Sequence, residues 1–202
     1  MKKYSADQLL SFNEDIVFEE PVLIVNEDGE ILALEDKSDH ENSSIQHIDG
    51  ILAPGFVNAH CHLELSHLKG QIDTGTKLIP FITGIVEKRD FPKETIFEKM
   101  KQADQDMYEM GISVVGDISN VSDSFEIKKS SKIFYHTFIE LFDLMQESGL
   151  EKQLNSGHEL FQQTEKLGIS ASLTPHAPYS VSANLFSSIA KHSTRLSIHN
   201  QE

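Results

Sequence analysis

The sequence has very little cysteine, few basic residues and no long apolar run. Cys61 is the only cysteine among 202 residues, which excludes an intramolecular disulfide and a cysteine-based zinc finger. Lysine and arginine total 17 against 32 aspartates and glutamates, giving a formal charge of −15. Nucleic acids and anionic membranes are bound by basic surfaces, so we expect neither as a partner.

Membrane insertion and export are also not expected. No apolar run approaches the roughly 20 residues that a transmembrane helix needs. Polar residues interrupt positions 1–20, where a signal peptide would have its apolar core. A cytoplasmic location is the expectation that remains, and the missing targeting signal is its only support. The content of 39% hydrophobic and 24% charged residues is typical of a folded protein.

Residues 1–54 predict a β-rich leader. The turn at Asp28-Gly29 is typical of a hairpin, and Pro54-Gly55 ends the last apolar run of this region. So small a sheet is not stable alone and must pack against another part of a protein. The predicted strands are 16–18, 22–25, 31–34 and 45–51.

Residues 55–202 alternate between strand and helix patterns, which indicates parallel βαβ units. Strands are predicted to start near residues 56, 112, 132, 169 and 196; helices are predicted over 77–88, 95–110, 150–167 and 183–192. A closed (β/α)8 barrel needs about 250 residues, whereas only 148 follow Pro54. A five-stranded doubly wound sheet and the first five-eighths of a barrel both fit this length.

His60 and His62 are the first candidate metal ligands. They lie two residues apart on a predicted strand, so their imidazoles leave the same face of the sheet. Neutral imidazoles placed in this way can share a zinc-class ion. A bare His-x-His pair often arises by coincidence, but this pair ends the first parallel strand, where α/β proteins build their active sites.

Two more candidate groups lie at the ends of later predicted strands. His199 ends the fifth predicted strand and Glu202 follows three residues later, where a carboxylate could pass protons between a water and a leaving group. His176 follows the fourth predicted strand, between Pro175 and Pro178, which stiffen the backbone around it. Packing alone does not explain histidines at three strand ends.

These motifs, in this order, resemble the amidohydrolase superfamily, in particular its metal-dependent deaminase and chlorohydrolase branch. The run that begins at His62 is similar to aminofutalosine deaminases, although this finer likeness is carried by few residues. The matching segments are Pro54-Gly55-Phe56-Val57-Asn58-Ala59-His60-Cys61-His62-Leu63-Glu64, Pro175-His176-Ala177-Pro178-Tyr179-Ser180 and Ile198-His199-Asn200-Gln201-Glu202.

The resemblance implies a role for each matching residue. It makes His60, His62 and His199 ligands of one divalent metal ion, with zinc expected and iron as the alternative. It makes Glu202 the catalytic proton carrier and His176 a substrate-binding residue. Glu64 is assigned to substrate binding as well, with pairing to a nearby cation as an equal alternative.

The resemblance also implies a fold and a reaction. The fold is α/β: an incomplete (β/α)8 TIM-type barrel of about five βα units in residues 55–202, after a leader that forms part of a composite β-sandwich. The reaction is the release of ammonia from an amino-substituted nitrogen heterocycle, adenine-like or aminofutalosine itself, by metal-activated water. An amide- or chloro-hydrolase on the same scaffold and a non-catalytic relative are the alternatives. A homodimer is an open alternative to a monomer.

Two elements of the family have no counterpart in these residues: a histidine of the sixth barrel strand and an aspartate of the eighth. We therefore expect the chain to be the amino-terminal portion of a longer protein, and expect these residues alone not to turn over substrate. Among the remaining candidates, Cys61 is expected to be a small buried residue and His67 to face solvent. His136 and Glu140 are expected in the core or at the rim of the sheet.

Overall fold

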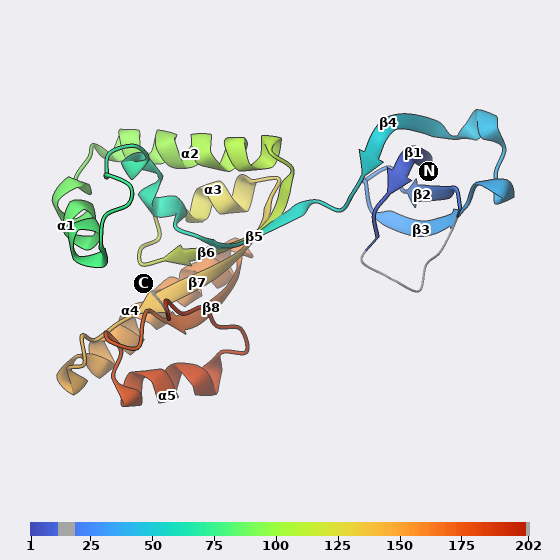
Figure 1. The fold of residues 1–202 in the computed structure, drawn as a ribbon. Coiled ribbons are helices and arrows are strands. Elements are labelled where there is room, and N and C mark those ends of the chain that lie inside the picture. Colours follow the sequence, from blue (N-terminus) through green and yellow to red (C-terminus); the bar gives the residue numbers. More distant parts are fainter. Residues whose placement is uncertain (12–18, 201–202) are drawn as a thin grey trace. The chain divides into compact units, whose positions relative to one another are not determined.

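The computed structural model describes residues 1–11 and 19–200 (Figure 1). The chain divides into two compact units, Met1–Gly55 and a second unit that begins at Phe56. Each unit is considered by itself. Among the helices of the described residues, none is long and apolar enough to cross a membrane.

The first unit is a four-stranded sheet with the order β3-β2-β1-β4. Its hairpin turn forms at Asn26, whose side-chain oxygen accepts the N–H groups of Asp28 and Glu30, with Gly29 at a φ of 86°. β1 pairs antiparallel with β2 and parallel with β4, and β2 pairs antiparallel with β3. The bounds are Lys2–Leu9 for β1, Pro21–Val25 for β2, Ile31–Asp36 for β3 and Gln46–Leu52 for β4.

The sequence predictions for this unit are mostly confirmed. The strands expected over 22–25, 31–34 and 45–51 are β2, β3 and β4. The strand expected over 16–18 lies outside the described residues. β1 was not predicted, because its sequence KKYSADQL has no apolar run and only its position between β2 and β4 makes it a strand.

The second unit is a parallel sheet in which neighbouring strands follow the order of the chain, β5-β6-β7-β8. A doubly wound sheet reverses its strand order at a switch point, whereas the sheet of a TIM barrel adds each strand beside the previous one. The observed order therefore confirms the partial barrel. The strands are β5 (Phe56–Cys61), β6 (Ile112–Ser119), β7 (Phe134–Leu141) and β8 (Ser170–Pro175).

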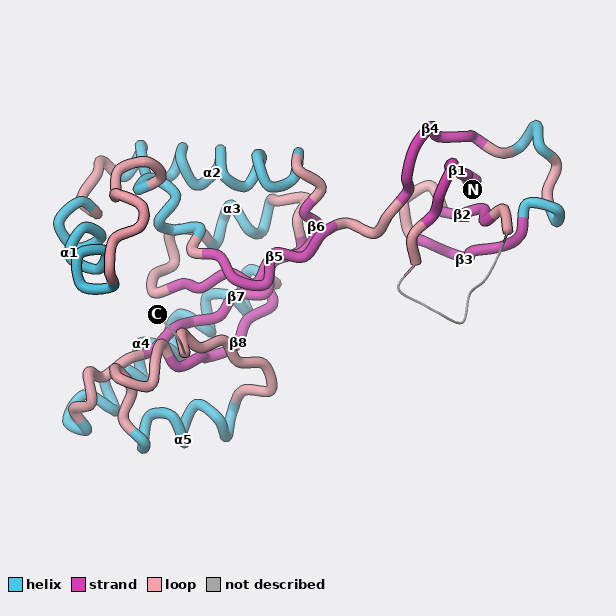
Figure 2. The backbone as a smooth tube through the Cα atoms, in the orientation of Figure 1, coloured by secondary structure: helices cyan, strands magenta, loops and turns pink. Residues whose placement is uncertain are grey.

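Helices connect these strands, as the alternation in the sequence predicts (Figure 2). α4 and α5 have the predicted bounds, and Gly168 ends α4 at a φ of 72°. α3 is six residues long and was not predicted, because so short a segment has no measurable periodicity. The helices are α1 (Leu78–Lys88), α2 (Lys93–Glu109), α3 (Phe125–Ser130), α4 (Leu150–Leu167) and α5 (Ala183–His192).

The fifth strand predicted over 196–199 does not form, so the parallel sheet of the described residues has four strands. The segment still runs beside β8, but side-chain hydroxyls replace the backbone ladder. The Thr174 hydroxyl accepts the N–H of Ser197 and donates to its carbonyl, and the Ser172 hydroxyl donates to the carbonyl of Arg195. One backbone bond follows, from His199 N–H to His176 O at 2.8 Å.

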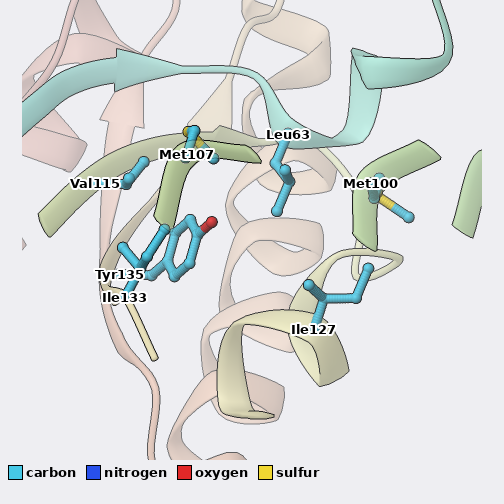
Figure 3. Packing of buried hydrophobic residues seen from close by; sticks show 7 residues of the cluster. All are labelled: Leu63, Met100, Met107, Val115, Ile127, Ile133 and Tyr135. Atoms are coloured by element: carbon cyan, nitrogen blue, oxygen red, sulfur yellow. The ribbon is translucent and has the colours of Figure 1, made fainter. Parts of the chain in front are cut away.

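Two clusters of buried apolar side chains hold the second unit together. Figure 3 shows the first, in which the loop after β5 and the helices α2 and α3 pack on β6 and β7. The second joins β7 and β8 to α5 and includes Leu141, Leu173 and Leu185. Gly157 lets α4 approach this cluster, because a Cβ there would lie 2.9 Å from Leu141. The first cluster consists of Leu63, Met100, Met107, Val115, Ile127, Ile133 and Tyr135.

Candidate metal centre

Three histidines meet where the parallel strands end. His60 lies on β5 and His62 directly follows that strand. Their Nε2 atoms are 3.2 Å apart, and the Nε2 of His199 lies 3.3 Å from that of His62. The sequence predicted this set, although His199 reaches it from an extended segment and not from a strand.

The three imidazoles fit a tetrahedral metal ion. Zn–N bonds of about 2.0–2.1 Å at tetrahedral angles place ligand nitrogens about 3.3 Å apart, which agrees with the two observed separations of 3.2 and 3.3 Å. Burial, and then the neighbouring imidazoles of His60, His199 and His176, lower the pKa of His62 to about 4. His62 is therefore neutral near pH 7, the state in which its nitrogen can bind a metal.

A buried ion pair holds the backbone just after His62. The Asp117 carboxylate, on β6, accepts the N–H of Leu63 at 2.7 Å. It is paired with the ammonium of Lys128, from α3, and neither side chain has exposed surface. The other two ammonium donors reach the hydroxyls of Ser119 and Thr137 at 2.8 and 3.1 Å. All three donors of this lysine are used, so the segment that follows β5 is tied to β6, β7 and α3 directly after His62.

His176 faces the same cavity from the loop after β8. Its Nδ1 lies 2.7 Å from the hydroxyl of Ser180, and its ring centre is 5.1 Å from that of His199. The backbone N–H of His176 donates to the carbonyl of Leu141. These contacts set the orientation of the ring and leave Nε2 as the nitrogen available to a ligand. The position agrees with the substrate-binding role expected of His176.

Glu140 lies closer to the histidines than the sequence analysis expected. It sits near the end of β7 and is buried, its Oε2 accepts the side-chain amide of Asn120 at 3.1 Å, and its Oε1 lies 3.6 Å from the Nε2 of His199. Glu140, His176 and His199 place one potential ligand atom each within 4.8 Å of one another. Its position at the carboxyl end of a parallel strand is the signal that could have marked it.

The role of Glu64 in substrate binding, or in pairing with a cation, stays a prediction. This carboxylate is buried and accepts the backbone N–H groups of Asn120 and Val121, at 3.1 and 3.4 Å. It is not among the residues that line the cavity. Burial, and then the carboxylate of Asp117, raise the pKa of Glu64 to about 7. The contacts of Glu64 hold the loop after β6 in place. Glu202, the predicted proton carrier, lies outside the described residues.

The structure also tests three residues that were given no role. The expectation that His67 faces solvent is wrong: the residue is buried, lies 3.1 Å from the carbonyl of Arg89 and packs on the ring of Phe91. His136 is in the core, as expected, between the hydroxyls of Ser170 and Ser172. Cys61 is partly buried and not fully buried as expected. Desolvation, and then Asp117, raise the pKa of its thiol to about 12, which agrees with an unreactive thiol.

A cavity of about 480 Å³ opens beside the three imidazoles. Four histidines and Tyr179 line one end of it, and apolar side chains from α1 and from the segment before it line the rest. The complete lining is His60, His62, Leu65, Leu68, Ile72, Leu78, Phe81, Ile82, Ile85, His176, Tyr179 and His199. Its volume is in the range of small-molecule sites, about 300–1,000 Å³.

Comparison with known proteins identifies a family domain in this chain. The model of the amidohydrolase family matches residues 51–202. A 5′-deoxyadenosine deaminase of Methanococcus vannielii is 31% identical over 155 residues, which cover 70% of this chain and 35% of that protein.

Solved structures resemble the chain in fold. The aminofutalosine deaminase of Helicobacter pylori, in complex with methylthio-coformycin, has a TM-score of 0.82 at 24% identity, over 99% of this chain and 51% of that one. The atrazine chlorohydrolase of Arthrobacter aurescens, complexed with zinc, has a TM-score of 0.74 at 16% identity, over 98% and 52%. This chain therefore spans about half of these structures.

Proposed function

The chain belongs to the amidohydrolase family. We propose that its protein is a metal-dependent deaminase, which releases ammonia from an amino-substituted nitrogen heterocycle. The observation that carries this proposal is the cluster of three histidine Nε2 atoms with separations of 3.2 and 3.3 Å, at one end of a cavity of small-molecule size. The names of the similar proteins, a 5′-deoxyadenosine deaminase and an aminofutalosine deaminase, support an adenine-like substrate.

His60, His62 and His199 would hold one divalent ion, for which we propose zinc, with iron as the alternative. A zinc complex in the similar chlorohydrolase supports this choice. Such an ion acts as a Lewis acid and lowers the pKa of a water from 15.7 to about 7. The water would be activated beside the three histidines, so the ring carbon that loses ammonia is expected to lie at this end of the cavity.

The remaining roles belong to side chains of this chain. His176, oriented by Ser180, would hydrogen-bond a ring nitrogen of the substrate. Glu202 would pass one proton of the reacting water to a ring nitrogen and the other to the leaving amine, transfers that require a carboxylate within hydrogen-bond reach of these atoms.

Metal binding is tested on the chain itself, by competition for zinc with a chromophoric chelator. We expect one zinc per chain and at least about a hundredfold weaker binding by His62→Ala and His199→Ala, since each loses a direct ligand. His158→Ala is the matched control, because this histidine is exposed on α4. Unchanged affinity in the two ligand variants would refute the proposed metal site.

The reaction is tested with the full-length protein, loaded with zinc or iron, by measuring ammonia released from adenine, adenosine and related aminopurines. Ammonia release that is lost in Glu202→Gln and His62→Ala supports the proposal. The fold shared with an atrazine chlorohydrolase makes chloride release from a chlorotriazine the parallel assay. Chloride or amide hydrolysis without deamination would favour the second candidate function, and no turnover in a zinc-binding protein would identify a non-catalytic relative.

A further inference from the structure

A second group of potential ligands lies beside the three histidines. Glu140, His176 and His199 each offer one ligand atom, and these atoms lie within 4.8 Å of one another. We call these three residues the mixed set, and His60, His62 and His199 the histidine set. Glu140 is in register with Thr174 of β8, and His176 follows two residues later. The backbone N–H of His199 donates to the carbonyl of His176 at 2.8 Å, which holds these two histidines together.

Glu140 brings a buried negative charge to the mixed set. Its side chain is only 4% exposed. Asn120 donates its side-chain amide to Oε2 at 3.1 Å, and Oε1 lies 3.6 Å from the Nε2 of His199. Within the part of the chain that the structure describes, His199 is its one ion-pair partner, and no lysine or arginine pairs with it. Burying a carboxylate is costly unless it is paired or coordinates a metal, and a divalent ion beside Oε1 would meet this need.

His176 has the orientation of a metal ligand. The hydroxyl of Ser180 donates its single hydrogen to the carbonyl of Ala177 at 3.2 Å. It therefore accepts the N–H at Nδ1 of His176, 2.7 Å away, and the lone pair of this ring lies on Nε2. Histidines that bind metals normally donate their second ring N–H to an oxygen of the protein, which fixes the tautomer in this way.

The donor atoms of the mixed set suit a zinc-class ion. Two imidazoles and one carboxylate are among the ligand sets that hold zinc in proteins, whereas magnesium and calcium prefer oxygen ligands alone. Zinc bonds of about 2.0–2.2 Å at tetrahedral angles place ligand atoms about 3.3 Å apart, close to the 3.6 Å between Glu140 Oε1 and His199 Nε2.

The two sets share one nitrogen. The Nε2 of His199 lies 3.3 Å from that of His62 and 3.6 Å from Glu140 Oε1. A single lone pair binds a single ion, so the two sets cannot both be complete. When the histidine set holds an ion, Glu140 and His176 remain for a second one, which has two protein ligands and is bound more weakly.

We propose that the mixed set is a second, weaker site for a zinc-class ion, and that an ion bound there blocks the substrate cavity. Such an ion takes the Nε2 of His176, and both His176 and His199 line the cavity. The heterocycle and the second ion therefore compete for the same space. The binding site itself does not depend on the proposed deamination, whereas its inhibitory effect rests on that function.

The second ion is measured by equilibrium dialysis of the full-length protein against zinc, because a chelator strong enough to report the first ion would remove the second. We expect a second equivalent, bound about a hundredfold or more weakly than the first. Glu140→Gln should weaken the second equivalent at least about tenfold and change the first by less than about threefold. Glu159→Gln is the matched control, since this glutamate is exposed on α4.

A native protein without a second equivalent, or a second equivalent that persists in Glu140→Gln, would overturn the site. If Glu140→Gln does not fold, His176→Asn removes another ligand of the mixed set, and an unchanged second equivalent in that variant has the same meaning.

A variant of the first site tests the shared histidine. His62→Ala breaks the histidine set and leaves the mixed set whole, so the remaining zinc should bind through Glu140, His176 and His199. Adding Glu140→Gln to His62→Ala should then weaken this remaining zinc at least about tenfold, although Glu140→Gln alone changes the tight zinc by less than about threefold. The same factor in both backgrounds would contradict the shared histidine.

Kinetics test the competition. At zinc concentrations four times the dissociation constant of the second ion, the apparent KM for adenosine should rise about fivefold with kcat unchanged, and Glu140→Gln should remove the dependence of KM on zinc. A KM that zinc does not change would refute the block. A second equivalent in a protein that releases no ammonia keeps the site and defeats only the proposed function, and ammonia release without a second equivalent does the reverse.

Discussion

Replacing Lys128 by methionine tests whether the buried ion pair beneath the metal centre stabilises the second unit. Methionine keeps the length of the side chain and removes its charge. Asp117 would then be a carboxylate with no exposed surface and no cation beside it, keeping the N–H of Leu63, the hydroxyl of Ser119 and the thiol of Cys61. Removing one partner of a buried pair costs about 3–5 kcal/mol, a large fraction of the roughly 5–15 kcal/mol that stabilises a typical domain.

Urea unfolding followed by far-UV circular dichroism measures the loss, and hydrogen exchange of amides in β6 and β7 assigns it to the second unit. Lys129→Met is the control: this lysine is exposed on the same helix, so its change should stay within about 0.5 kcal/mol. The double variant Asp117→Asn with Lys128→Met leaves no unpaired charge and should lose less than the sum of the two single variants.

The same variant should weaken zinc binding, because the Asp117 carboxylate holds the N–H of Leu63 next to His62, a proposed metal ligand. A loss of less than about 1 kcal/mol in Lys128→Met, or strictly additive effects in the double variant, would refute the argument that the charges depend on each other.

Three further predictions concern single positions. Gly116→Ala should destabilise the second unit by about 1–3 kcal/mol or more, because a Cβ at position 116 would lie 2.6 Å from the carbonyl oxygen of Ala59 on the neighbouring strand. An unchanged urea midpoint would contradict this close approach. Cys61 should react with a thiol reagent at pH 8 at least about a hundredfold more slowly in the native than in the unfolded chain. The reason is that burial and Asp117 raise its pKa to about 12, so its thiolate appears only at higher pH. Equal rates would show an accessible thiol. Met145→Gly should stabilise the chain by up to about 1 kcal/mol, because Met145 has a φ of 62° that glycine adopts without strain; a lower melting temperature in calorimetry would count against it.

Local patterns in the sequence were sufficient for the longer elements. α4 and α5 have the predicted bounds because their periodicity is strong and because glycine or a capping serine marks their ends: Gly168 adopts a positive φ, and the Ser182 side chain accepts the N–H of Leu185. β1 and α3 were missed for the opposite reason. Neither has a strong local pattern, and each is stabilised by the elements that pack beside it.

Periodicity also predicted that His60 and His62 leave one face of a strand, and strand order placed His176 and His199 at the same end of the sheet. These are short-range rules of backbone geometry, so the sequence by itself placed these histidines at one end of the sheet. The family and the partial barrel followed from the resemblance of its motifs to the amidohydrolase superfamily.

Only the tertiary structure decided which polar residues support the site and which line it. Glu64 lies two positions after His62, yet its carboxylate contacts the backbone of Asn120, 56 positions away in the chain. Lys128 pairs with Asp117, which lies on another element. The segment predicted as a fifth strand is bound to β8 by the hydroxyls of Ser172 and Thr174. One face of α1 lines the cavity. A buried polar group takes the partner that the packing brings to it, and neither spacing nor composition specifies that partner.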